Sequence, residues 1–171
     1  KNKLKTKNLI FKFVNETPNG PAYTVSSIKN ILRNSKEPCV IINSDQFVDF
    51  DLPNKFDRDN IYIPLYFNNH GNSSYVKLNS QGSIIEIKEK ILISNYASSG
   101  VYIFSSSTLL KKILGLINKI RQKKEVNMSD LINIFIKKNK KKVNPISTLA
   151  KYDLGNIKDI KNFTIKDLKV F

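Results

Sequence analysis

The chain has 171 residues, 40% of them hydrophobic, and a formal charge of +15 from 29 Lys and Arg against 14 Asp and Glu. This length and apolar fraction predict one globular domain, spanning residues 1–171, and exclude a disordered polypeptide. The charge alone would favour a nucleic-acid partner, but Arg occurs only at positions 33, 58 and 121. Because recognition of bases and phosphates favours the Arg fork, we expect no nucleic-acid binding.

The small numbers of cysteine, histidine and methionine residues limit the kinds of site that the chain can form and the compartment in which we expect it. Cys39 is the only cysteine, which rules out a disulfide framework and predicts a reducing, cytoplasmic location. With His70 as the only histidine, a nucleophilic triad and a zinc site are not expected. No run approaches the roughly 18 apolar residues of a membrane span, so no membrane partner is expected. The chain begins at Lys1 and its only methionine is Met128, which predicts a fragment of a longer domain.

Strands and helices are predicted to alternate along the chain. Strand patterns cover 9–14, 39–42, 61–67, 73–78, 83–87, 97–104 and 141–148. Helical spacing covers 22–34, 108–120, 129–138 and 157–163. This order predicts an α/β fold with three αβα layers, in which helices cover both faces of a mixed, mostly parallel sheet.

Two aspartates stand out because each follows an extended segment. Asp45 lies just past the apolar strand 39–42, and Asp153 stands two residues before Gly155. Ligands of open α/β sheets bind at such strand ends, where a carboxylate can hold a metal ion against a phosphate. The pair therefore suggests a divalent-metal site for phosphoryl or nucleotidyl chemistry. The alternative is that each Asp caps the helix or turn that follows it.

Three further segments are candidates for ligand contact. Gly20 opens a helix from a tight loop, where its backbone could approach a flat ligand, although such loops also serve as ordinary turns. Lys90 ends a hairpin strand after Glu89 and could neutralise a phosphate, or both could be surface charges. Gly100 and its small neighbours occur where a strand would have to admit a ligand.

The order of these segments resembles that of a known family. The motifs are Thr-x-x-Gly-Pro-Ala (17–22), Ile-Ile-Asn-Ser-Asp-Gln (41–46), Ser-Tyr-Val (74–76), Glu-Lys-x-x-x-Ser (89–94), Ala-Ser-Ser-Gly-Val-Tyr-Ile-Phe (97–104) and Asp-Leu-Gly-Asn-x-x-Asp-Ile-x-x-Phe (153–163). Over nearly the whole chain they resemble the sugar-phosphate nucleotidyltransferase family, which has a nucleotide-diphospho-sugar transferase (GT-A-like) fold. The family's N-terminal Gly-rich loop, with its Arg and Pro-Lys, is not found in this sequence. Asn156 replaces the usual Thr, and residues 127–130 replace a Gly-Glu motif.

The resemblance implies an Mg²⁺-dependent enzyme that joins an NTP to a sugar phosphate or another small phosphorylated metabolite and releases pyrophosphate, for surface polysaccharide synthesis. The implied metal ligands are Asp45 and Asp153, which with Lys90 would be the catalytic residues. The implied acceptor-binding residues are Glu89, Lys90 and Gly100, with Lys90 on the acceptor's phosphate. The implied nucleotide-binding residues are Thr17, Gly20, Pro21, Ala22 and Ser44.

Two alternatives stay open at this point. One is a catalytically silent nucleotide-binding or regulatory domain with the same fold. The other is a cytidylyltransferase that acts on a non-sugar phosphate. The motifs identify neither the NTP nor the acceptor, and they leave a homo-oligomer possible.

Overall fold

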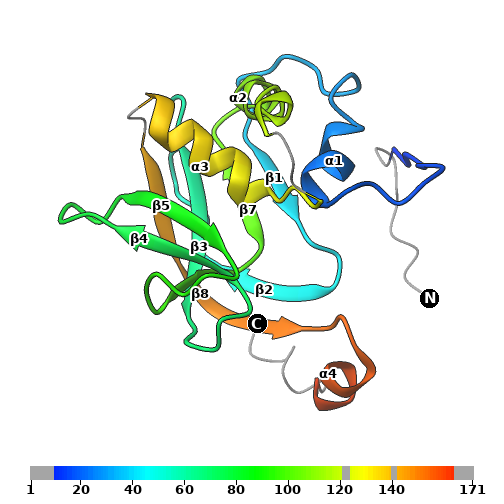
Figure 1. Ribbon diagram of the computed structural model, residues 1–171. Coiled ribbons are helices and arrows are strands. Elements are labelled where there is room, and N and C mark those ends of the chain that lie inside the picture. The colour runs from blue at the N-terminus through cyan, green and yellow to red at the C-terminus, as the bar shows by residue number, and fades with distance from the viewer. Residues whose placement is uncertain (1–9, 121–123, 140–141, 164–171) are drawn as a thin grey trace.

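The computed structural model describes residues 10–120, 124–139 and 142–163 (Figure 1). Leu9 and Lys141, the first residues of two predicted strands, lie outside these ranges. The strands are β1 Cys39–Ile42, β2 Gln46–Phe50, β3 Ile61–Phe67, β4 Ser74–Leu78, β5 Ile84–Glu89, β6 Tyr96–Ser98, β7 Val101–Phe104 and β8 Val143–Asp153. The helices are α1 Pro21–Ser26, α2 Ser107–Leu114, α3 Met128–Asn139 and α4 Ile157–Asn162, with a 3₁₀ turn at Ile117–Lys119.

The strands form one sheet in the order β1-β7-β3-β6-β4-β5-β8-β2, with a further pairing of β3 with β8. The prediction of a mostly parallel sheet is wrong. Among the strands that the structure describes, β3 and β8 run parallel and the other pairs run antiparallel. The strand directions follow from the connections between the strands. Two parallel neighbouring strands need a long crossover connection, whereas two strands joined by a tight turn are antiparallel. Here α2 and α3 lie on the crossover that leads back to β8.

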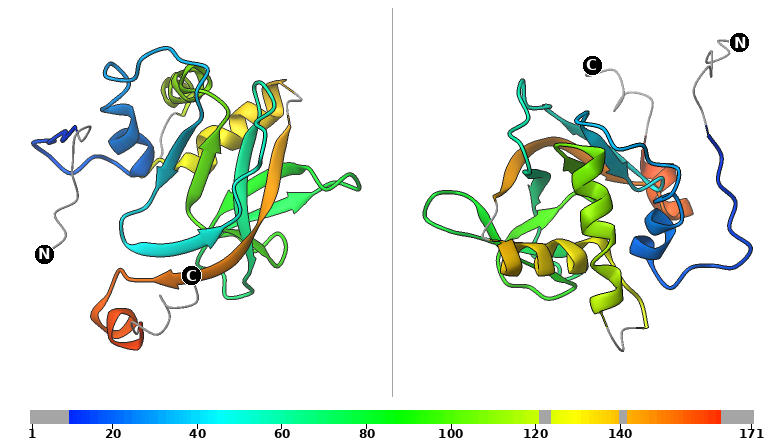
Figure 2. Two further views of the ribbon diagram at one scale, coloured as in Figure 1. Left: turned by 180° about the vertical axis from the view of Figure 1, so that it is seen from behind. Right: turned by 90° about the horizontal axis from the view of Figure 1, so that it is seen from above.

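The predicted third layer is not found in the described part of the chain. Ile61, Ile63 and Leu65 point to one face of β3 and pack with apolar side chains of α2 and α3. Tyr62 points to the other face, where a smaller cluster includes residues of β2, such as Val48, and Phe56 from the loop after it. Figure 2 shows α1, α2 and α3 gathered on one side of the sheet. Two layers therefore describe the core, and a loop with a strand covers the second face.

The sheet has a break beside the middle of β3. The predicted strand 97–104 bends at Ser99 and Gly100, which divides it into β6 and β7. β3 pairs with β7 through its first residues and with β6 through its last, so Pro64 lies opposite the bend. The carbonyl of Pro64 accepts a hydrogen bond from Ser99 N at 2.9 Å. The N and C=O groups of one strand residue point to the same side, so the N of Pro64 also faces this break. The missing N–H of the proline therefore falls where the ladder is already interrupted, and its absence disturbs the sheet least.

Other predictions differ from the structure mainly in polar segments. Residues 10–14 form no strand, and the helix predicted over 22–34 ends at Ser26 and continues as turns. β2 was not predicted, because Gln46 and Asp49 interrupt its apolar residues and its sequence shows no alternation of polar and apolar residues. β8 continues five residues beyond the predicted end at Thr148, up to Asp153, since β2 pairs with that extension.

Leu131→Ala in α3 tests this core against Leu149→Ala in β8. Leu131 is fully buried, whereas Leu149 is 60% exposed at a bulge between β2 and β8. Truncating the buried leucine removes apolar contacts and leaves a cavity, so the free energy of unfolding should fall by about 2–5 kcal/mol. The exposed leucine should cost less than about 1 kcal/mol. Urea denaturation followed by circular dichroism measures both, and equal losses would contradict the described core.

Candidate functional site

A cavity of about 1030 Å³ opens beside the break in the sheet. One end is formed by the loop that leads into α1, including Thr17, Gly20 and Pro21. The turn after β1 and the end of β8 contribute the two aspartates, Asp45 and Asp153. The other end is rich in hydroxyl and amide side chains, namely Tyr66, Asn72, Ser73, Ser74, Ser98, Ser99 and Tyr102. The cavity thus joins a backbone loop, a carboxylate pair and a polar end.

The two aspartates are brought together by the pairing of β2 with β8. Gln46 pairs with Asp153 in the antiparallel ladder, and Leu154 N donates to the carbonyl of Asp45 at 2.7 Å. The side chain of Asp45 also packs against Gly155, where an added Cβ would lie 3.4 Å from Asp45 Oδ2. Asn156, the next residue, caps α4 by accepting from Asp159 N at 2.9 Å. Both aspartates are exposed to the cavity, so their carboxylates are available to a ligand.

The loop before α1 is fixed against the segment that precedes α3. Val126 N donates to Asn19 O at 2.9 Å, and Ala22 N donates to Val126 O at 3.0 Å. Gly20 has φ 107° and ψ 167°, a conformation that is essentially restricted to glycine. An added Cβ would lie 2.6 Å from Val126 O. The sequence folds this way because Gly20 permits the close backbone approach and Pro21 then starts the helix.

Glu89 is the carboxylate of the hydroxyl-rich end. Its Oε2 accepts hydrogen bonds from the hydroxyls of Ser74 and Ser129, the latter at 3.2 Å. Burial raises the pKa of the nearby Tyr102 phenol, hydrogen bonds with Ser98 and Ser74 lower it in part, and the charges of Glu89 and Asp130 raise it further. The phenol is therefore neutral at physiological pH and keeps its proton for donation.

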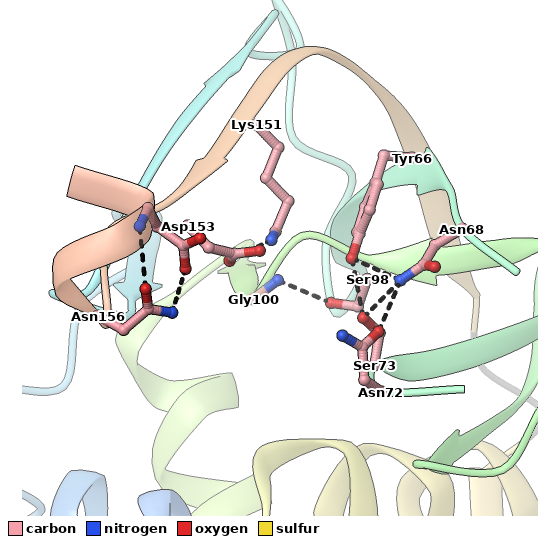
Figure 3. Close-up of polar contacts among 10 residues, drawn as sticks. Tyr66, Asn68, Asn72, Ser73, Ser98, Gly100, Lys151, Asp153 and Asn156 are labelled. Carbon is pink, nitrogen blue, oxygen red and sulfur yellow. Dashed lines mark hydrogen bonds and ion pairs between the residues drawn. The ribbon is translucent and has the colours of Figure 1, made fainter. Parts of the chain in front are cut away.

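A second polar cluster holds this end in shape (Figure 3). Tyr66 OH and Ser73 Oγ form a hydrogen bond of 2.8 Å. The buried amide of Asn68 donates to Ser73 Oγ at 2.9 Å and lies 3.1 Å from both Tyr66 OH and Asn72 Oδ1. Because each buried polar group here has a partner, the cluster orders the cavity wall without a ligand.

Other buried polar atoms at the cavity have no partner in the described chain. They are Gln46 Nε2 and Ser99 Oγ, and both residues line the cavity next to Gly100. Gly100 has φ 83°, and an added Cβ would lie 2.6 Å from Gln46 Nε2. A buried donor without a partner is costly, so these two groups are suited to binding oxygens of a ligand.

The structure brings most of the residues singled out in the sequence to this cavity. Thr17, Gly20, Pro21, Ser44, Asp45, Glu89, Gly100 and Asp153 all line it. Ala22 is fully buried and does not line it, so its role here is packing. Lys90 is exposed with φ 55° and does not line it either. Lys151 lines the cavity and was missed, because only the extension of β8 reveals that it shares a strand face with Asp153.

Nothing in the described chain offers a third carboxylate, His or Cys to the aspartate pair as a ready-made metal cluster. Magnesium sites commonly use one or two carboxylates together with substrate phosphates, so two aspartates are a sufficient protein contribution. None of the helices in residues 10–163 that the structure describes is long and apolar enough to span a membrane.

Comparisons with known proteins identify the family and the fold of the chain. A family model described as Nucleotidyl transferase matches residues 5–169. No curated protein matches the sequence. The nucleoside-diphosphate-sugar pyrophosphorylase from Vibrio cholerae RC9 has a similar structure, with a TM-score of 0.66 and 20% identity over 87% of this chain and 66% of that one.

Two further solved structures share the fold. A UDP-glucose pyrophosphorylase complexed with UDP-glucose gives a TM-score of 0.67 at 14% identity, over 91% of this chain and 64% of that one. The inositol-1-phosphate CTP transferase from T. maritima gives 0.61 at 14% identity, over 89% and 61%. At these identities the likeness shows the mixed α/β fold. The chain spans less than two thirds of the length of each of these structures.

Gly20→Ala should destabilise the protein more than Gly82→Ala. Both glycines have positive φ, but an alanine methyl at 20 would clash with the backbone of Val126, whereas position 82 is open. We expect a loss of about 3 kcal/mol at Gly20, from strain and displacement of the loop, and about 1 kcal/mol at Gly82, from strain alone. Chemical denaturation measures both losses, and a Gly20 variant as stable as the Gly82 variant would contradict the docked loop.

Proposed function

The chain belongs to the nucleotidyl transferase family, and on that premise we propose that its protein transfers a nucleotidyl group from an NTP to a sugar phosphate or another small phosphorylated metabolite. The observation that supports this most is the position of Asp45 and Asp153. They lie in one cavity between a glycine loop and a hydroxyl-rich end, where the two substrates of such a transfer would meet.

The glycine loop suits the nucleotide. Thr17, Gly20 and Pro21 present backbone and small side chains to the cavity, and the loop is already fixed against Val126. A flat base can lie close to such a surface because Gly20 has no side chain. Ser44 lies beside Asp45 at the point where the nucleotide's phosphates would reach the carboxylates.

The carboxylate pair fits Mg²⁺, which prefers oxygen ligands and keeps positions for water and phosphate. Asp45 and Asp153, which both line the cavity, would hold the ion. When bound, the ion would neutralise phosphate charge and align the reacting groups. In the transfer, a phosphate oxygen of the acceptor attacks the α-phosphorus of the NTP, the bond to the β-phosphate oxygen breaks, and pyrophosphate leaves.

The hydroxyl-rich end suits an acceptor with several hydroxyl groups. Glu89 can accept from a ligand hydroxyl, while the unpartnered Gln46 Nε2 and Ser99 Oγ can donate to ligand oxygens. Among the structural neighbours, one is bound to UDP-glucose and another is named for inositol 1-phosphate. A polyol or sugar phosphate is therefore the acceptor that we favour. A role of the product in surface polysaccharide synthesis rests on the family resemblance.

The activity is tested by measuring Mg²⁺-dependent pyrophosphate release by the full-length protein. Each of the four common NTPs is paired with sugar phosphates, inositol phosphate, phosphocholine and phosphorylated amino acids. We expect release that requires one NTP and one polyol phosphate. Release only with CTP and phosphocholine or a phosphorylated amino acid would instead identify a cytidylyltransferase acting on a non-sugar phosphate. A folded protein that binds NTP and releases no pyrophosphate with any pair would contradict the proposal and favour a silent nucleotide-binding domain.

Asp45→Asn should lower the rate of pyrophosphate release about a hundredfold or more, because an amide lacks the charge that holds the ion against the phosphates. Asp51→Asn is the matched control, since Asp51 is exposed after β2 and outside the cavity. Its rate should stay within about twofold of the wild type. Unfolding measurements verify that both variants are folded, and a near wild-type rate in Asp45→Asn would exclude the metal assignment.

A further inference from the structure

The phosphate of the acceptor needs a cation, and in the part of the chain that the structure describes two lysines line the cavity. They are Lys124 and Lys151. Lys124 is exposed and adjoins Glu125, whose Cγ lies 2.8 Å from the position of a Cβ added to Gly20. Lys124 thus lies at the end of the cavity that is formed by the glycine loop. Lys151 comes from β8, on the same strand face as Asp153.

Lys151 is held in place on two sides. Its Nζ lies 2.5 Å from Asp153 Oδ1 and 4.9 Å from the centroid of the Tyr66 ring. The side chain is only 11% exposed, whereas that of Asp153 is 63% exposed. A lysine with so little exposure has lost most of its freedom before any ligand arrives, so binding an anion costs little further entropy.

The ammonium group of Lys151 lies between the aspartate pair and the hydroxyl-rich end of the cavity. On one side is Asp153, and on the other is Tyr66, whose hydroxyl joins the cluster of Ser73 and Asn68 (Figure 3). A phosphorylated acceptor whose hydroxyls meet that end must place its phosphate toward the aspartates, since its phosphate oxygen attacks the nucleotide. Lys151 is located where that phosphate would lie.

Lys90, the lysine of the Glu-Lys motif, has a different environment. It follows β5 in a left-handed conformation with φ 55°, and its N–H donates to Ser73 O at 2.9 Å. Its side chain is exposed and outside the cavity. The backbone of Lys90 thus extends the β4–β5 ladder at its open end, and the ammonium would have to leave solvent to reach a phosphate.

We propose that Lys151, rather than Lys90, is the cation that binds the phosphate of the acceptor, an inference that rests on the proposed nucleotidyl transfer. The ammonium has three donors, so it can stay paired with Asp153 and donate to a phosphate oxygen at the same time. The ion pair also offsets one of the two negative charges of Asp45 and Asp153, which reduces the repulsion that an incoming phosphate would meet.

The test is binding of inorganic phosphate to the full-length protein in the presence of MgCl₂, measured by ³¹P NMR titration. Removing one charge-assisted bond in Lys151→Met should raise the dissociation constant for phosphate tenfold or more. Lys151→Arg keeps the charge and should stay within about threefold of the wild type. Lys90→Met and the control Lys77→Met, an exposed lysine on β4, should each stay within about twofold. The thermal unfolding temperature of each variant shows whether weaker phosphate binding comes from loss of the binding site or from loss of the fold.

Two outcomes would overturn the proposal. One is wild-type phosphate binding by the folded Lys151→Met variant, which, if Lys90→Met binds more weakly, would assign the phosphate to the motif lysine. The other is no phosphate binding by the wild-type protein. Neither outcome decides the proposed activity, because pyrophosphate release from an NTP and an acceptor is measured separately.

Discussion

The site depends on one contact between distant parts of the chain, the pairing of the turn after β1 with the end of β8. The hydrogen bond of 2.7 Å from Leu154 N to Asp45 O, together with the pairing of Gln46 and Asp153, brings the two aspartates into the same cavity. The like charges of two carboxylates in one cavity oppose this arrangement. The ammonium of Lys151, which is paired with Asp153, offsets part of that repulsion. A cation bound by both carboxylates would offset the rest.

The second constraint is the break in the sheet. A continuous strand over 96–104 would fill the space beside β3, but the bend at Ser99 and Gly100 divides it. Pro64 lies at the same level and has no N–H to leave unpaired there. Gln46 Nε2 and Ser99 Oγ, which lie next to the bend, are buried and have no hydrogen-bond partner in the described chain. The backbone irregularity and the unpaired donors thus occur together, as expected where a protein keeps polar groups for a ligand.

The elements that could be predicted from the sequence are those that depend on local residue patterns, such as an apolar run or the residues of a turn. β3 was predicted at its observed bounds because its run of apolar residues is buried on both faces, and Asp45 and Gly20 were identified from local turn chemistry. The sheet direction was not predictable in this way, because it depends on which distant strands pair. β2 could not be predicted because of its polar residues. The extension of β8 that carries Lys151 pairs with β2, so it was not predicted either. Lys90 was chosen from a motif, and the structure places it, with positive φ, at the exposed open end of the β4–β5 ladder.

We propose that Asp45 and Asp153 together bind one divalent cation between the nucleotide and the acceptor. The most direct measurement is anomalous diffraction from crystals of the full-length protein grown with Mn²⁺ and a non-hydrolysable NTP analogue. We expect one strong anomalous peak within about 2.5 Å of oxygens of both aspartates and of the analogue's phosphates. A bound analogue with no peak between the two carboxylates, or with the peak elsewhere in the cavity, would contradict a shared metal site at Asp45 and Asp153.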